Sequence, residues 1–212
     1  MTTETPKRRY EKKARAANEQ ATRMRIIDAA IDLHGSIGPA QTSISAIADR
    51  AGVRRATVYR HFPDERSLFM GCSGTFGERN PLPDPGTWAS APDPEERLAA
   101  ALDAIYAWYE RVEPMLTALM RDIDKVPMVQ ELQAGRFAYL EGIENGLAPG
   151  WGARGNAAKR LRATLGLALD FLAWRTLHER GLTRADAIDV MSAAVRAASA
   201  SQALSGGAAR AR

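Results

Sequence analysis

A twelve-residue stretch, AGVRRATVYRHF at residues 51–62, concentrates side chains that form directional hydrogen bonds. An arginine can bind guanine O6 and N7 through two parallel hydrogen bonds, and a threonine methyl group can contact a thymine methyl group. Tyrosine and histidine can donate to phosphate oxygens. The stretch therefore suits contact with a nucleic-acid duplex, although a solvated helix face is the alternative that these residue types leave open.

Two short helices joined by a glycine turn are predicted to position these side chains. Thr42-Ser43 offers an N-cap hydroxyl for the first helix, and Gly52 permits the positive φ of a tight turn. The buried stripe of the first helix comprises Ile44, Ile47, Ala48 and Ala51. In the second helix Val58 and Phe62 face inward. The residues that remain outward are Arg54, Arg55, Thr57, Arg60 and His61. This is a helix-turn-helix arrangement, whose second helix enters the major groove.

One helix precedes this pair and another follows it. The preceding helix has apolar residues at helical spacing from Ile26 to Leu33, and Gly35 and Gly38-Pro39 end it. The following helix begins after Pro63, where Asp64 and Glu65 suit the positive end of the helix dipole.

The stretch IIDAAIDLHGSIGPAQTSISAIADRAGVRRATVYRHFPDERSLF resembles the N-terminal domain of the TetR family of transcriptional regulators, over residues 23–69. The remainder of the chain is similar to the family only in layout. The matching positions are Ile27–Ala30, Leu33, Gly38, Thr42-Ser43, Ile47-Ala48, Ala51-Gly52-Val53, Thr57-Val58-Tyr59, His61-Phe62 and Leu68. The resemblance implies a homodimeric, cytoplasmic repressor that a small-molecule effector releases from a palindromic operator in double-stranded DNA.

The resemblance also implies roles for individual residues. The implied base-edge contacts come from Arg55, Ala56 and Thr57, with Arg54 and Arg60 as additions. The implied phosphate contacts come from Tyr59, His61, Thr42, Ser43 and Ser45.

Three positions depart from the family pattern. Aromatic residues are usual where His34 and Pro39 stand, and a lysine or arginine that grips phosphate is usual where Glu65 stands. Arg66 is adjacent and is the candidate to make that phosphate contact instead. His34 lies on the apolar side of its predicted helix, which favours a core histidine over a ligand.

Charge and cysteine content agree with this interpretation. Residues 1–66 hold 13 lysines and arginines against 8 acidic residues, whereas residues 67–212 hold 16 against 17. A basic end on a near-neutral body is typical of nucleic-acid binding. A single cysteine, Cys72, excludes an intramolecular disulfide and favours a reducing compartment. No signal peptide and no membrane span are expected.

The chain is predicted to be all-α. The expected segments are a basic flexible arm (1–20), the helix-turn-helix domain (21–70), a Gly/Pro-rich connection (71–94), a helical effector-binding and dimerisation domain (95–204) and a disordered tail (205–212). Extension of the next helix backwards through AANEQATRMR, residues 16–25, is the alternative for the end of the arm. Within the fourth segment, Pro94, Pro114 and Pro127 mark helix starts, and two further helices are expected near 156–179 and 184–203.

The larger domain offers a dimer face and a candidate effector pocket. Residues 161–174 are apolar on two faces, so a partner subunit is expected on one of them, together with the last helix. Asp170 interrupts this run, either as a pocket anchor or as a structurally paired or exposed carboxylate. The candidate pocket residues for a small apolar or aromatic effector are Tyr106, Tyr109, Met115, Met120, Phe137, Asp170, Phe171 and Trp174. A filled core, with control by a protein partner or by no effector, is the alternative.

Catalysis is not expected. Three histidines and one cysteine are too scattered for a metal motif, and no Gly-x-Ser-x-Gly elbow occurs. Residues 150–155 spell Gly-x-Gly-x-x-Gly, but no predicted strand precedes them, so no dinucleotide cofactor is expected.

Overall fold

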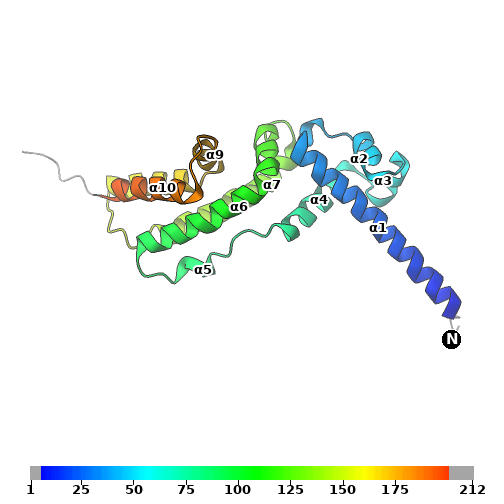
Figure 1. The fold of residues 1–212 in the computed structure, drawn as a ribbon, viewed down its shortest axis with the longest axis horizontal. Helices are drawn as coiled ribbons and strands as arrows, with labels where there is room; N and C mark the ends of the chain where they lie inside the picture. The colour runs from blue at the N-terminus through cyan, green and yellow to red at the C-terminus, as the bar shows by residue number, and fades with distance from the viewer. Residues whose placement is uncertain (1–5, 201–212) are drawn as a thin grey trace, which may run out of the picture. The chain divides into compact units, whose positions relative to one another are not determined.

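The computed structural model describes residues 6–200, with side chains from Lys12 onward and that of Tyr10. Its helices are α1 (Pro6–Ser36), η1 (Pro39–Gln41), α2 (Ile44–Ala51), α3 (Arg55–His61), α4 (Glu65–Arg79), α5 (Gly86–Ala89), α6 (Pro94–Asp122), α7 (Pro127–Leu147), α8 (Asn156–Leu169), α9 (Phe171–Glu179) and α10 (Arg184–Ser199) (Figure 1). No strand occurs between residues 6 and 200, and the predicted all-α class is confirmed.

The helices form two compact units. The first comprises the chain up to Pro81 together with Val112–Gln133, and the second comprises Leu82–Arg111 together with the chain from Ala134. The helix α6 is continuous and contributes residues to both units.

The core of the first unit lies among α1, α2, α3 and α4. Its most enclosed side chains are Ile26, Ile27, Ala30, Ile47, Ala48, Val58, Phe62 and Leu68. Each short helix has a local start or stop. Ser43 accepts a hydrogen bond from the Ala46 amide at 3.1 Å, and Gly52 ends α2 with φ 65°. Asp64 accepts from the Ser67 amide at 2.6 Å in a reciprocal cap. The predicted inward stripe of α2 is therefore buried as expected.

The single cysteine lies in this core. Cys72 is 2% exposed, its thiol donates to the Phe69 carbonyl at 3.1 Å, and its Sγ lies 3.6 Å from Nδ1 of His34. Burial raises the pKa of the Cys72 thiol to about 11 and lowers the pKa of His34 to about 4. His34 is thus a neutral core histidine, in agreement with the sequence.

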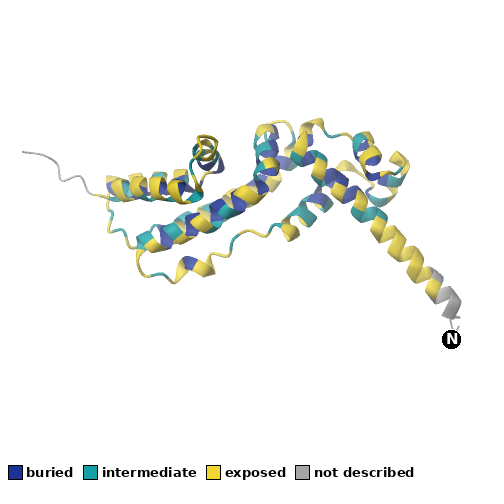
Figure 2. Ribbon diagram, viewed as in Figure 1, coloured by how far each residue is buried: buried dark blue, intermediate teal, exposed yellow. Residues whose placement is uncertain are grey.

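The first helix begins earlier than its apolar pattern indicates. It starts at Pro6, so residues 6–20, expected as a flexible arm, are helical here. Residues 12–21 are exposed on every side, as Figure 2 shows, and so carry no apolar stripe. Alanine, lysine, arginine, glutamate and glutamine are strong helix formers and continue the helix without tertiary contacts. Hydrophobic spacing therefore does not reveal the start of a helix whose first residues have no buried face.

Three other helix boundaries differ from the predicted ones. The helix α4 reaches Arg79, which shortens the expected connection, and α6 passes through Pro114 without ending. A proline inside a helix costs about 3 kcal/mol. The buried stripe that includes Val112, Leu116 and Leu119 continues past it and offsets that cost. The expected helix over 156–179 is broken at Asp170.

The break at Asp170 organises the core of the second unit. It leaves the last carbonyl groups of α8 without helical partners. The hydroxyl of Tyr106 donates to the Ala168 carbonyl at 2.8 Å, and that of Tyr109 donates to the Leu169 carbonyl at 2.6 Å. Asp170 itself is exposed and caps α9 by accepting from the Ala173 amide at 2.9 Å. Asp170 is thus an exposed N-cap, as the alternative of an exposed carboxylate has it, and its role as a pocket anchor stays a prediction.

The last helix is attached within the second unit on two sides. It packs beside α8, and two of its arginines reach α6. Arg196 donates to both carboxylate oxygens of Glu95, at 2.8 and 2.6 Å, and Arg184 lies 3.0 Å from oxygens of Asp103 and Glu110. The tail expected from residue 205 lies outside the described residues.

Candidate nucleic-acid interface

The helix α3 presents its polar residues outward and its apolar residues inward. Val58 is fully buried and Phe62 is 2% exposed, so the helix is anchored along one side. The exposed residues are Arg54, Arg55, Ala56, Tyr59 and Arg60, and Thr57 is half-buried beside them. The structure therefore brings together on one surface the residues expected to contact bases.

The arginines of this surface differ from those around it. Arg54, Arg55 and Arg60 form no ion pair within the part of the chain that the structure describes. Nearby arginines are paired: Arg50 with Asp32, and Arg79 with Asp28 at 2.7 Å. The helix α3 and its N-cap thus present three positive charges that no carboxylate of the described residues neutralises, as contact with a polyanion requires.

Arg55 and Tyr59 interact on the same face of α3. The Arg55 Nη2 lies 3.2 Å from the Tyr59 hydroxyl, and its guanidinium carbon lies 5.5 Å from the ring centroid. Residues four apart on a helix are neighbours, so the two side chains touch along the helix surface. A residue expected to contact a base and one expected to contact a phosphate therefore lie side by side.

His61 is placed less favourably for a phosphate contact. Its ring is half-buried, and Nε2 is enclosed with no hydrogen-bond partner in residues 6–200. Nδ1 is left as the nitrogen for the implied contact.

The hydroxyl groups before α2 are partly engaged. Thr42 Oγ1 donates to the Gly38 carbonyl at 2.8 Å, and Ser43 Oγ accepts from the Ala46 amide. Ser43 keeps its hydroxyl proton for an acceptor, and Ser45 is exposed one residue into the helix. The expected phosphate contacts at Ser43 and Ser45 are therefore sterically open, whereas the Thr42 proton is committed to Gly38.

Arg66 is held by a carboxylate from a distant part of the chain. Its guanidinium donates to both oxygens of Glu131 on α7, at 3.1 and 2.7 Å. Both side chains are more than half exposed, and the contact lowers the pKa of Glu131. Glu131 lies 65 residues along the chain, so no local pattern in the sequence pointed to it.

Replacing Glu131 with glutamine is expected to strengthen DNA binding by about two- to fivefold. The variant removes the carboxylate that holds Arg66, so that Arg66 is able to contact the DNA phosphate that Glu65 cannot bind. The measurement is the dissociation constant for one DNA duplex. Leu132→Gln, an exposed neighbour on α7, is the matched control. This assignment would be contradicted if Glu131→Gln gave the same gain in DNA affinity in a chain in which Arg66 is also replaced by alanine.

The candidate effector residues divide between the two units. Met115 and Met120 belong to the first unit, and the other six belong to the second. Tyr106, Tyr109, Phe171 and Trp174 form one buried ring cluster, with centroids 5.3 to 6.4 Å apart. Phe137, by contrast, is 45% exposed. Four of the eight residues are therefore brought into direct contact with one another.

One residue beside this cluster was not singled out in the sequence. Arg136 on α7 is 9% exposed next to Tyr109, and burial lowers its pKa. Its neighbours Gly135 and Phe137 are exposed, and nothing in the local sequence distinguishes it from a surface arginine.

Within residues 6–200, no cluster of three or more histidine, cysteine, aspartate or glutamate side chains could hold a metal ion. Among the described helices, none has both the length and the hydropathy to cross a membrane.

Comparison with known proteins relates the first unit to bacterial regulators. The family model described as "Bacterial regulatory proteins, tetR family" matches residues 26–70. The HTH-type transcriptional regulator AcrR of Shigella flexneri is 44% identical over 50 residues, which are 24% of this chain and 23% of that protein. The chain therefore matches about a quarter of the length of this curated relative.

Solved structures extend the similarity of fold to most of the chain. A TetR-like transcriptional regulator from Rhodococcus sp. RHA1 has a TM-score of 0.58 at 20% identity, covering 82% of this chain and 93% of that one. The regulator FadR of Bacillus subtilis, solved in complex with stearoyl-CoA, has a TM-score of 0.52 at 21% identity, covering 84% and 97%. Residues 26–70 therefore match the model of the TetR family of bacterial regulatory proteins, and most of the chain has the fold of these solved regulators.

Proposed function

We propose that this protein is a DNA-binding regulator. It is a cytoplasmic, non-catalytic repressor that binds a palindromic operator and is released by a small molecule. The proposed DNA contact is supported by the surface of α3. There Arg54, Arg55 and Arg60 are exposed and unpaired among the described residues, on a helix anchored by Val58 and Phe62. Base edges are assigned to Arg55, Ala56 and Thr57, because they lie on the first turn of α3.

A homodimer through α8 and α10 completes the proposal. These two helices pack side by side and leave Leu167 and Val190 about half exposed, at 53% and 46%. Exposed alanines at 163, 193 and 194 lie on the same two helices and permit close approach of a second copy. An isologous dimer would place two α3 helices on a two-fold symmetric site.

The release by an effector rests on the second unit. FadR, which shares the fold, was solved with stearoyl-CoA, and ligand control is proposed here by that analogy of fold. Four aromatic rings pack against one another in the second unit, those of Tyr106, Tyr109, Phe171 and Trp174. This packing favours the alternative to an effector pocket there, which is a filled core with control by a protein partner or by no effector. Arg136 beside Tyr109 adds a buried cation to the residues that an effector would meet.

The deciding experiment is selection of the full chain on a random pool of double-stranded DNA, followed by gel shifts on the enriched sequence. An enriched inverted repeat, bound by two chains as judged from sedimentation of the complex, is the expected result. Addition of a metabolite panel then separates the two alternatives, since an effector must release the DNA. Enrichment of no sequence over the starting pool would refute the proposal.

The exposed part of α1 is expected to add backbone contacts. Replacing Lys13 and Arg15 together with glutamine should reduce the slope of log affinity against log salt concentration by about 1–2, because each lost phosphate contact removes about 0.9 from it. Both residues are exposed on the helical segment without apolar contacts. The matched control is Lys159→Gln with Arg180→Gln, two exposed charges of the second unit. An unchanged slope in the Lys13 and Arg15 variant would refute the contact.

A further inference from the structure

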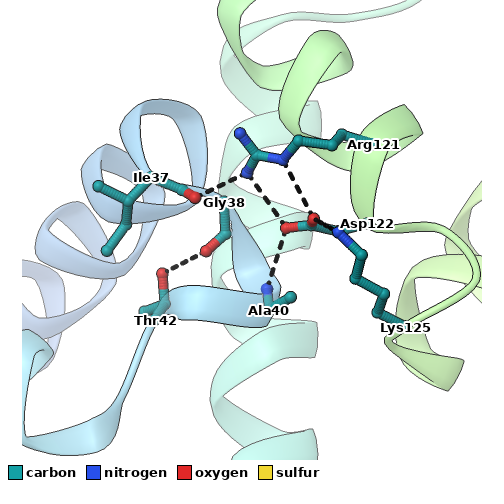
Figure 3. A network of polar contacts seen from close by, with 7 residues as sticks. All are labelled: Ile37, Gly38, Ala40, Thr42, Arg121, Asp122 and Lys125. Carbon is teal, nitrogen blue, oxygen red and sulfur yellow. Dashed lines mark hydrogen bonds and ion pairs between the residues drawn. The ribbon is translucent and has the colours of Figure 1, made fainter.

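A fully buried carboxylate lies at the end of α6, within the first unit. The side chain of Asp122 has no exposed surface, and its oxygens accept four hydrogen bonds (Figure 3). The donors are the Ala40 amide at 3.1 Å, Arg121 Nε at 3.1 Å, Arg121 Nη2 at 3.3 Å and Lys125 Nζ at 3.2 Å. The contact with Arg121 is the main reason why the pKa of Asp122 falls to about 2, so the group is ionised at neutral pH. Its charge is thus fully compensated inside the protein.

The same network forms hydrogen bonds with residues on both sides of the turn between α1 and α2. Asp122 accepts from Ala40 after the turn, and Arg121 Nη2 donates to the Ile37 carbonyl before it, at 2.7 Å. Gly38 lies between these two attachment points with φ 92°. A Cβ atom at Gly38 would overlap Arg121 Nη2 and the Asp122 carboxylate. The turn and the end of α6 are therefore fitted to each other without spare space.

The gripped turn leads directly into the hydroxyl residues before α2. The Gly38 carbonyl accepts from Thr42 Oγ1 at 2.8 Å, and Ser43, the next residue, caps α2. Figure 3 shows Ala40 and Thr42 on the same short segment, with the Ala40 amide directed at the carboxylate and the Thr42 hydroxyl directed at Gly38. Asp122 is thus hydrogen-bonded to the segment that precedes α2, where the phosphate contacts are expected, and none of the four hydrogen bonds that it accepts comes from α3.

We propose that Asp122 is a positioning residue for DNA binding, which sets the place of the α2 N-terminus through the Ala40 amide and through Arg121. The inference rests on the proposed DNA contacts of the first unit. All of the contacts involved lie within the first unit, to which the last part of α6, from Val112 to Asp122, belongs.

The test compares Asp122→Ala with Asp122→Asn and with Asp124→Ala, which removes an exposed carboxylate two residues away. Asp122→Ala removes the buried carboxylate that accepts from the Ala40 amide, Arg121 and Lys125, and an affinity loss of about tenfold or more is expected. Asp122→Asn keeps an oxygen for the Ala40 amide and is expected to recover part of the loss. Asp124→Ala is expected to match the unaltered chain. Titration at concentrations far above the dissociation constant gives the active fraction, so that unfolded protein is not counted as weak binding.

Two readouts separate positioning from general stability. Hydrogen exchange at the Ala40 amide should accelerate in Asp122→Ala, whereas exchange in α3 should stay unchanged. The ranking of DNA sequences should also stay unchanged, because the base contacts of α3 are intact. If the unaltered chain binds no DNA, the proposed function fails, and this inference with it. If the unaltered chain binds DNA and Asp122→Ala binds equally tightly with a full active fraction, only the positioning role is overturned.

Discussion

Replacing Trp174 with alanine is expected to lower the free energy of unfolding by about 3–5 kcal/mol, the range for deletion of a large buried aromatic side chain. The indole is 1% exposed. Its ring centroid lies 5.5 Å from that of Tyr109 and 5.7 Å from that of Phe171, and it stacks on His178 at 5.1 Å. Removing it leaves a cavity among rings whose hydroxyls are tied to the end of α8, which limits collapse into the space.

Urea denaturation followed by near-ultraviolet circular dichroism measures this effect. Leu172→Ala is the matched control, because Leu172 lies on the same helix and is 50% exposed. The control is expected to cost less than about 1 kcal/mol. A loss below that value for Trp174→Ala would show that the ring cluster repacks freely, and would favour a roomy, ligand-accepting interior over a filled core.

Replacing Arg55 with alanine is expected to reduce discrimination at one base pair of the operator about ten- to hundredfold, the range for a bidentate base contact. Arg55 is exposed on the first turn of α3 and is held by Tyr59 at 3.2 Å. Its loss removes a contact that differs between base pairs. Tyr59→Phe instead removes a hydroxyl expected at phosphate, and should weaken binding to all sequences alike.

The measurement for Arg55 is a selection on an operator library, which reports preference at each position separately from overall affinity. Arg180→Ala, an exposed arginine of the second unit, is the control for loss of one positive charge. A profile for Arg55→Ala that has the same preferences as the unaltered chain, at reduced affinity, would reassign Arg55 to the backbone.

The helix-turn-helix could be predicted in detail because its determinants are local. The apolar spacing from Ile44 to Ala51, the αL position at Gly52 and the cap at Asp64 all act within a few residues, and the structure reproduces them. The outward set on α3 followed from Val58 and Phe62 by helical geometry alone. Hydrophobic spacing did not locate the helix at residues 6–20, because that segment is polar and packs on no core. The rule that a proline marks a helix start failed at Pro114, because burial of the neighbouring residues keeps α6 continuous.

The features that depend on distant pairs could not be predicted. Asp122 stands near a predicted helix end, and its sequence neighbours give no sign of the Ala40 amide 82 residues away. Glu131 and Arg66 are both ordinary surface residues by type, and their pairing is a property of the fold. Asp170 was correctly singled out as costly inside an apolar run, and the chain resolves that cost by ending one helix and capping the next.

Cys72 gives the chain a chemical reporter of its own first unit. It is the sole cysteine of the 212 residues, and burial keeps it as a thiol at any pH at which alkylating reagents are normally used. Reaction with such a reagent requires the core formed by α1 and α4 to open. The labelling rate therefore measures the opening of this core within the 212-residue chain, without a truncation or an engineered residue.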